Sequence, residues 1–293
     1  MDLFDLVKDF LEYMEIERNV SQLTIRNYKH YLERFLGFLK QSSTPSDITA
    51  ENIRQYRLYL SRFTDKNNLT LKRVTQNYHL IALRSFLKYL LKRDIAVIAP
   101  EKIDLPKAES RSIKFLERDQ VERLLNMPDN ARDKAILEVL FSTGLRVSEL
   151  TKLNRDQINF DRREFGVIGK GRRARVVFLS ESAAGWLKKY ISSREDSDAA
   201  LFVRTSGMKD APLRLTPRSV QRLVEKYVKN ARLPMKITPH GLRHSFATDL
   251  LTGGADLRAI QEMLGHKNVS TTLIYTHITN PQLKQIHEKF HRK

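Results

Sequence analysis

The chain has 293 residues, carries 52 Lys and Arg against 34 Asp and Glu, and contains no cysteine. This length allows two domains with cores of their own. The formal net charge of +18 favours a polyanionic partner, above all nucleic acid, although a basic soluble protein without such a partner fits as well. The missing cysteines exclude disulfides, thiolate metal sites and cysteine nucleophiles.

The hydropathy pattern indicates neither a membrane span nor an export signal. The first residues, 1–5, include two acids and lack a basic segment followed by an apolar run, so we expect no secretory signal. No apolar stretch approaches the roughly 18 residues that a membrane span needs. We therefore expect a soluble, cytoplasmic protein with no membrane partner.

Residues 1–99 show apolar side chains at helical spacing and no strand-like alternation. Helices are predicted over residues 3–14, after a cap at Ser21, over 53–63 and over 74–91. Lysines and arginines are scattered over these helices, which is typical of a helical domain that contacts DNA phosphates, and equally of an ordinary solvated surface. We predict a DNA-binding domain here.

Residues 100–112 are polar, contain two prolines and break the helical pattern, which predicts an interdomain linker. A second domain is expected over 113–279. It is predicted to open with helices at 117–125 and 132–141 and, after a break at Gly144, a helix that continues through Leu153.

The pattern then changes to period two between residues 158 and 180. Segments 158–160, 165–168 and 174–179 predict a small antiparallel sheet, with a glycine-bounded hairpin tip at 169–173. Helices are predicted again over 182–191, over 217–231 and after Pro239. The fold class is therefore mainly α with a small antiparallel β-sheet.

Arg146 lies two residues after Gly144, and Lys170 directly follows Gly169. Arg146 opens a helix just after Gly144, where backbone and side chain could approach an anion, or else it forms an ion pair with Glu149 at i+3. Lys170 stands at the hairpin tip among further cations, which lower a lysine pKa as a general acid requires. A tip that only touches DNA phosphate is the alternative.

His240 and Arg243 lie three residues apart after Pro239, on one face of a predicted helix. An imidazole and a guanidinium fork could thus meet one phosphate. His240 and His244 are also four apart, but a zinc site of this type needs glutamate after the first histidine, and the residue there is glycine. We therefore expect no metal.

His266 follows Leu-Gly, and Tyr275 falls within a helix predicted to start near Ser270. Taken singly, the histidine suits a helix end and the tyrosine suits a core. Together with Arg146, Lys170, His240 and Arg243 they suit one reaction. The arginines would stabilise a pentacoordinate phosphorus, Tyr275 would attack it, and Lys170 would protonate the leaving 5′-oxygen. His240 would accept the tyrosine proton or bind the phosphate, and His266 would donate to an oxygen. No cofactor is expected, neither a divalent metal nor ATP.

The segments that carry these residues resemble the tyrosine recombinase, or phage integrase, family. They read TGLRVSEL at 143–150, GKG at 169–171, TPHGLRHSFAT at 238–248, LGH at 264–266 and TTLIYTH at 271–277. All six active-site positions of the family have a match: Arg146, Lys170, His240, Arg243, His266 and Tyr275. The layout is similar to the compact Xer branch.

The resemblance implies a helical SAM-like N-terminal domain and an α+β catalytic domain that clamp duplex DNA. It further implies a homo- or hetero-tetramer, 3′-phosphotyrosyl and Holliday-junction intermediates, and resolution of chromosome dimers at a dif-like site before cell division, with a DNA translocase as a candidate partner. Residues 280–293 carry an apolar stripe that predicts a short basic tail helix. That helix could dock on a neighbouring protomer, as tails of this family do, or fold back on its own domain.

Three alternatives stay open at this point. A phage or mobile-element integrase shares the motifs, although such proteins often carry an extra arm-binding domain. A type IB topoisomerase shares the chemistry but relaxes supercoils as a monomer. A non-catalytic DNA-binding relative would show no covalent adduct.

Overall fold

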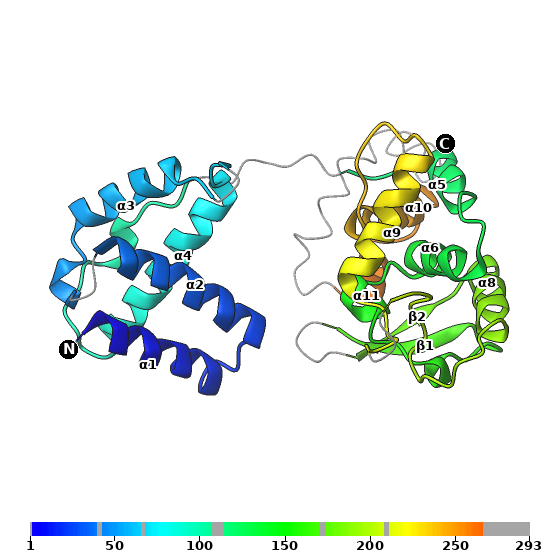
Figure 1. The fold of residues 1–293 in the computed structure, drawn as a ribbon, viewed down its shortest axis with the longest axis horizontal. Coiled ribbons are helices and arrows are strands. Elements are labelled where there is room, and N and C mark those ends of the chain that lie inside the picture. The colour runs from blue at the N-terminus through cyan, green and yellow to red at the C-terminus, as the bar shows by residue number, and fades with distance from the viewer. Residues whose placement is uncertain are drawn as a thin grey trace, which may run out of the picture. The chain divides into compact units, whose positions relative to one another are not determined.

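The computed structural model of the chain describes residues 2–39, 43–65, 68–106, 114–169, 174–207 and 211–265. These residues belong to two compact units, Met1–Ser110 and Arg111–Lys293. Most of the described structure is helical, and the described strands form one two-stranded antiparallel sheet (Figure 1). The predicted fold class is therefore confirmed. None of the described helices is long and apolar enough to span a membrane.

The N-terminal unit is a bundle of helices (Figure 1). The apolar side chains of these helices share one core. Leucines make up much of this core, and the aromatic rings of Phe10, Tyr56 and Phe86 are buried among them. As predicted, Ser21 caps the second helix, where its hydroxyl accepts a hydrogen bond from the N–H of Thr24 at 3.3 Å. The elements are α1 (Leu3–Ile16), α2 (Gln22–Leu39), the 3-10 turn η1 (Pro45–Asp47), α3 (Ala50–Arg62), α4 (Arg73–Lys92) and the 3-10 turn η2 (Pro100–Lys102).

The N-terminal unit extends beyond the point where the linker was predicted to begin. The turn η2 packs on α4, and both Pro100 and Ile103 are buried in the core of this unit. Of the predicted linker, residues 107–112 lie outside the described residues. Two prolines mark the end of a helix but do not reveal that the next apolar residue returns to the core. The other domain boundaries stay predictions.

The C-terminal unit is built around α6, which packs against α5, α8, α9, α10 and β2 (Figure 1). The two strands pair antiparallel, with Glu164 opposite Phe178 and Ile168 opposite Ala174. Its elements are α5 (Arg118–Leu125), α6 (Ala131–Thr143), α7 (Val147–Leu150), the 3-10 turn η3 (Arg155–Gln157), β1 (Glu164–Ile168), β2 (Ala174–Phe178), α8 (Glu181–Ser192), α9 (Pro217–Asn230), α10 (Pro239–Thr252) and α11 (Leu257–Leu264).

Two local predictions in this unit were wrong. The helix predicted to continue through Leu153 ends at Leu150, because the Leu153 carbonyl instead accepts hydrogen bonds from the Leu201 N–H and from Arg214, both at 2.8 Å. Residues 158–160 do not form a strand, since only Asn159 makes an isolated bridge to the start of β1. Long-range partners, which local periodicity does not contain, decide both cases.

Candidate active site

Gly144 produces the break that places Arg146 at the start of a helix. It ends α6 in the left-handed conformation, with φ of +57°, and Arg146 follows as the N-cap of α7. A Cβ at Gly144 would lie 2.4 Å from Cδ1 of Phe246, so the ring of α10 leaves no room for a side chain. Glycine is therefore needed here both for its dihedral angle and for the close approach of α10.

The carboxylate of Glu149 lies between two arginines. It accepts hydrogen bonds from the N–H and the Nη1 of Arg146, at 2.9 and 2.8 Å, so the i+3 pair considered from the sequence is present. On the other side, Nη1 and Nη2 of Arg175 donate to the same carboxylate at 3.1 and 2.8 Å. The carboxylate thus holds Arg146 from α7 and Arg175 from β2 in one cluster.

Hydrogen bonding keeps Glu149 ionised although it is buried. Burial of the side chain by itself raises the pKa of the carboxyl. The hydrogen bonds from Arg175 and from the backbone and side chain of Arg146, with the charge of Arg175, outweigh this effect and lower the pKa to about 2. Glu149 therefore carries its charge at any pH at which the protein works, and it compensates part of the positive charge around it.

Arg243 projects from the first turns of α10 into the interior, where only 2% of the residue is exposed. The helix begins as predicted, with Thr238 as its N-cap and Pro239 in the first turn. Nη1 of Arg243 donates to the carbonyl of Gly144 at 2.7 Å, and Nη2 donates to the carbonyl of Leu264 at 2.5 Å. These two bonds fix the plane of the guanidinium between the end of α6 and the end of α11.

His240 lies on the same helix, one turn before Arg243. Partial burial and the positive charges of Arg243 and Arg146 lower its pKa. The imidazole is therefore neutral at pH 7 and can accept a proton or a hydrogen bond. Its ring meets the ring of His244 edge to face, with centroids 4.3 Å apart. Because Arg243 of the same helix binds the carbonyl of Gly144, two residues before Arg146, the three residues lie in one region.

The structure thus brings together Arg146, His240 and Arg243, half of the residues selected from the sequence. The other three, Lys170, His266 and Tyr275, lie outside the described residues. The catalytic roles of all six stay predictions. Arg175 was missed as a site residue because it stood among other cations of the predicted hairpin. The one feature that distinguishes Arg175 from those cations in the sequence is its position in a predicted strand, whereas the others lie at the hairpin tip.

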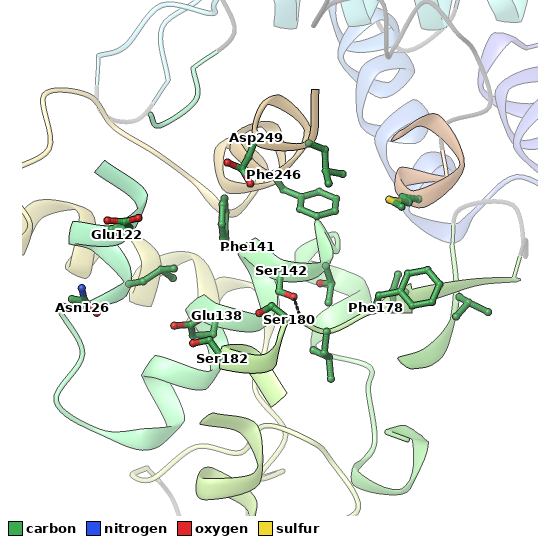
Figure 2. Close-up of a pocket in the computed structure, with 17 residues that line it drawn as sticks. Glu122, Asn126, Glu138, Phe141, Ser142, Phe178, Ser180, Ser182, Phe246 and Asp249 are labelled. Carbon is green, nitrogen blue, oxygen red and sulfur yellow. Dashed lines mark hydrogen bonds between the residues drawn. The ribbon is translucent and has the colours of Figure 1, made fainter. Parts of the chain in front are cut away.

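A second feature of the C-terminal unit is a cavity of about 560 Å³ between α5, α6, β2 and α10, referred to below as the apolar groove (Figure 2). Phe141, Phe178 and Phe246 line it, and Phe178 is about half exposed. Two carboxylates, Glu122 from α5 and Asp249 from α10, also border it. The groove adjoins the site, since Phe246 packs against Gly144.

Comparison with known proteins identifies the family. Residues 114–281 match the model of the phage integrase family, and residues 7–94 match that of the phage integrase N-terminal SAM-like domain. The chain therefore belongs to the phage integrase family of tyrosine recombinases, enzymes that break and rejoin DNA strands.

The similarity to individual relatives extends over nearly the whole chain. The chain is 37% identical to the tyrosine recombinase XerD of Oceanobacillus iheyensis, with 97% of each chain covered. It is 38% identical to the tyrosine recombinase XerC of Pelobacter propionicus, with 99% of this chain and 96% of the relative covered. Among solved structures, XerH bound to a palindromic difH substrate has the same fold, with a TM-score of 0.70, 22% identity, and 98% and 84% of the two chains covered.

Proposed function

We propose that this chain is a site-specific tyrosine recombinase that cuts and rejoins duplex DNA through a 3′-phosphotyrosyl intermediate. The observation that carries the proposal is the convergence of Arg146, His240 and Arg243 from two elements on one region, with Arg243 oriented by two backbone carbonyls. Guanidinium groups held in advance at fixed positions stabilise the charge that develops on a phosphoryl group without reorganisation during the reaction. The positive charge of the whole chain supports duplex DNA as the substrate.

In the proposed reaction, the Tyr275 oxygen attacks the phosphorus of the scissile phosphodiester. A tyrosine–phosphorus bond forms, and the bond between phosphorus and the 5′-oxygen breaks. His240 takes the tyrosine proton, since its lowered pKa keeps it neutral and able to accept one. Lys170 gives a proton to the leaving 5′-oxygen, and His266 donates a hydrogen bond to a phosphoryl oxygen. Attack of a 5′-hydroxyl on the phosphotyrosine reverses these steps and joins a new strand.

A covalent trapping assay tests this function. The protein is incubated with a nicked, labelled duplex that carries a dif-like site, in buffer with EDTA, and the products are separated on a denaturing gel. We expect a shifted band that disappears in Tyr275→Phe, with DNA binding unchanged. Arg243→Lys is expected to lower the cleavage rate roughly 100- to 1,000-fold, as removal of one stabilising group commonly does. Absence of a band on this duplex and on a preformed Holliday junction would leave only a DNA-binding role.

The finer assignment is to the Xer type, acting in the cytoplasm as a tetramer at a dif-like site to resolve chromosome dimers. Support comes from the names of relatives that match over nearly the full length, and these names include both XerC and XerD. One assay tells whether the chain acts alone, acts with a paralogue or needs activation by a DNA translocase. Recombination between two dif-like sites on one plasmid is measured with the chain alone, then with each added component.

The apolar groove supports docking of a tail from another protomer. The spacing of Leu283, Ile286 and Phe290 predicts an apolar stripe, and lysines and arginines occupy other positions in 280–293. A basic amphipathic segment of this kind matches a groove with aromatic walls and bordering carboxylates. The tail itself lies outside the described residues.

Deleting residues 281–293 tests the tail. We expect synapsis and strand exchange to fall much more than binding to a single site. Phe178→Ser, which removes an aromatic wall of the groove at a partly exposed position, should reproduce the effect in the full-length chain. Equal losses of single-site binding and of synapsis would contradict the proposal.

A further inference from the structure

Of the two arginines that bind Glu149, Arg175 is the more buried, with 10% of its side chain exposed against 31% for Arg146. Its two terminal nitrogens donate to the Glu149 carboxylate, and its Nε donates to the carbonyl of Met263 at 3.0 Å. One side chain therefore joins three elements: β2, on which it lies, α7 through Glu149, and the last turn of α11.

Arg175 and Arg243 bind neighbouring carbonyls at the end of α11. Arg175 donates a hydrogen bond to the carbonyl of Met263, and Arg243 donates one to the carbonyl of Leu264. The last carbonyls of a helix have no partner within the helix and carry partial negative charge, so cations are stabilising there. Gly265 then ends the helix with φ of +64°, and a Cβ at this position would lie 3.2 Å from Cδ of Arg175. The close fit fixes where the chain leaves α11.

Arg175 also affects how strongly the Glu149 carboxylate binds Arg146. The carboxylate accepts four hydrogen bonds, two from Arg146 and two from Arg175. Without Arg175, a buried negative charge would lose half of its donors and its second cation. Arg146 is the nearest replacement, and its guanidinium would be drawn further onto the carboxylate and away from any phosphate. A buried carboxylate that has lost half of its donors favours a tighter pair with its remaining cation, and the partly exposed side chain of Arg146 can shift to form one.

We propose that Arg175 is a positioning residue of the active site, which shares Glu149 with Arg146 so that the Arg146 guanidinium stays directed at the scissile phosphate, and which anchors the end of α11 beside Arg243. This inference rests on the proposed DNA-cleavage function. Arg175 does not serve as a DNA contact, because its guanidinium is nearly buried and each of its nitrogens donates within the protein.

The test separates the rate of cleavage from DNA affinity in the full-length chain. For Arg175→Met we expect the single-turnover rate of covalent adduct formation at saturating DNA to fall about 10- to 100-fold, as a displacement of about 1 Å can produce. The dissociation constant for the same duplex should change less than about threefold, because Arg175 contributes no phosphate contact. Arg175→Lys, which keeps the charge but loses the fork, should recover part of the rate.

Two further variants exclude a purely structural role. Arg194→Met removes another buried arginine, which binds Asp196 and carbonyls of its own loop, and should lower stability without changing the saturating rate of the folded protein. In Glu149→Gln, the additional change Arg175→Met should cost little more, because both residues act on Arg146 through the same pair.

Each outcome has a distinct meaning. An Arg175→Met protein that cleaves at the wild-type saturating rate overturns the positioning role. So does a loss that appears only in DNA affinity, or one that Arg194→Met reproduces at equal thermal stability. If the wild-type chain forms no covalent adduct on any duplex or junction, the proposed function fails, and this result is separate from failure of the Arg175 inference.

Discussion

The two units differ in what they bury. Among the described residues, the polar side chains buried in the N-terminal unit are those of Ser43 and His79, and aliphatic and aromatic side chains make up the rest of its core. The C-terminal unit buries Asp133, Lys134, Glu138, Glu149 and Arg243, along with several hydroxyls. Burying a charge costs free energy unless it is paired and hydrogen-bonded. In the second unit, buried ion pairs and hydrogen bonds therefore hold side chains of the candidate site in place, and the same pairs make this unit sensitive to single substitutions.

The largest effect is expected where a buried charge loses its partner. Lys134 of α6 lies 3.7 Å from Glu138, donates to the carbonyl of Leu125 and binds Asn126 at 2.9 Å. Lys134→Met would leave the Glu138 carboxylate buried without its cation. We expect the free energy of unfolding of the C-terminal unit to fall by about 3–5 kcal/mol, measured by urea denaturation.

The matched change in the N-terminal unit concerns an exposed pair. Arg54 donates to Glu51 at 2.7 and 2.8 Å, but both side chains are about 60% exposed. Arg54→Met should leave the urea midpoint unchanged, because water and salt already screen such pairs. Replacing both Lys134 and Glu138 by apolar residues should restore most of the loss. A small loss for Lys134→Met alone would show that Glu138 rearranges to reach water, and the contrast between the units would fail.

Each unit contains a histidine whose pKa is lowered to about 4. Burial is the main cause for both His79 and His244, and neighbouring positive charge adds to it: Arg34 in one case, His240 and Arg243 in the other. The unfolded chain takes up a proton on each histidine near pH 6.5, whereas the folded chain does not until about pH 4. Stability is therefore complete above pH 6.5 and falls as the pH drops toward 4, by about 2 kcal/mol per histidine between pH 7 and 5.

Native-state hydrogen exchange at pH 7 and 5 resolves the two histidines in the full-length chain. His79→Gln should weaken the pH dependence for peptides of α2–α4 and leave α10 unchanged, and His244→Gln should do the reverse. Glutamine keeps a hydrogen-bonding side chain without a titrating group. If either substitution changes the pH dependence in both units, the two cores do not respond independently.

The sequence allowed much of this fold to be predicted, because apolar spacing is a local property. It gave the helices of the N-terminal unit, the cap at Ser21, and the helix that carries His240 and Arg243 on one face. The family motifs selected Arg146, which lies two residues after the glycine whose carbonyl binds Arg243. Contacts between distant segments were missed. The role of Arg175 depends on Glu149 and Met263, which are 26 and 88 residues away, and no local pattern records such a pairing.

The smallest effects concern one glycine from each unit. In α2, a Cβ on Gly37 meets nothing within 4 Å, so Gly37→Ala should stabilise the N-terminal unit by about 0.5–1 kcal/mol through its helix propensity. Gly144→Ala has the opposite sign, because φ is +57° and the ring of Phe246 occupies the space that the new methyl group needs. We expect a loss of at least about 1 kcal/mol in the C-terminal unit by urea denaturation.

Because the Gly144 carbonyl accepts from Arg243, the same substitution should also slow cleavage at saturating DNA, whereas Gly37→Ala should not. If Gly144→Ala lowers stability but keeps the full cleavage rate, the carbonyl does not orient Arg243. Together the two alanine substitutions test whether a glycine is required throughout the protein or only where its backbone packs against the candidate site. In α2 a glycine can be replaced with a gain, and at the end of α6 the backbone is itself part of the arginine's binding site.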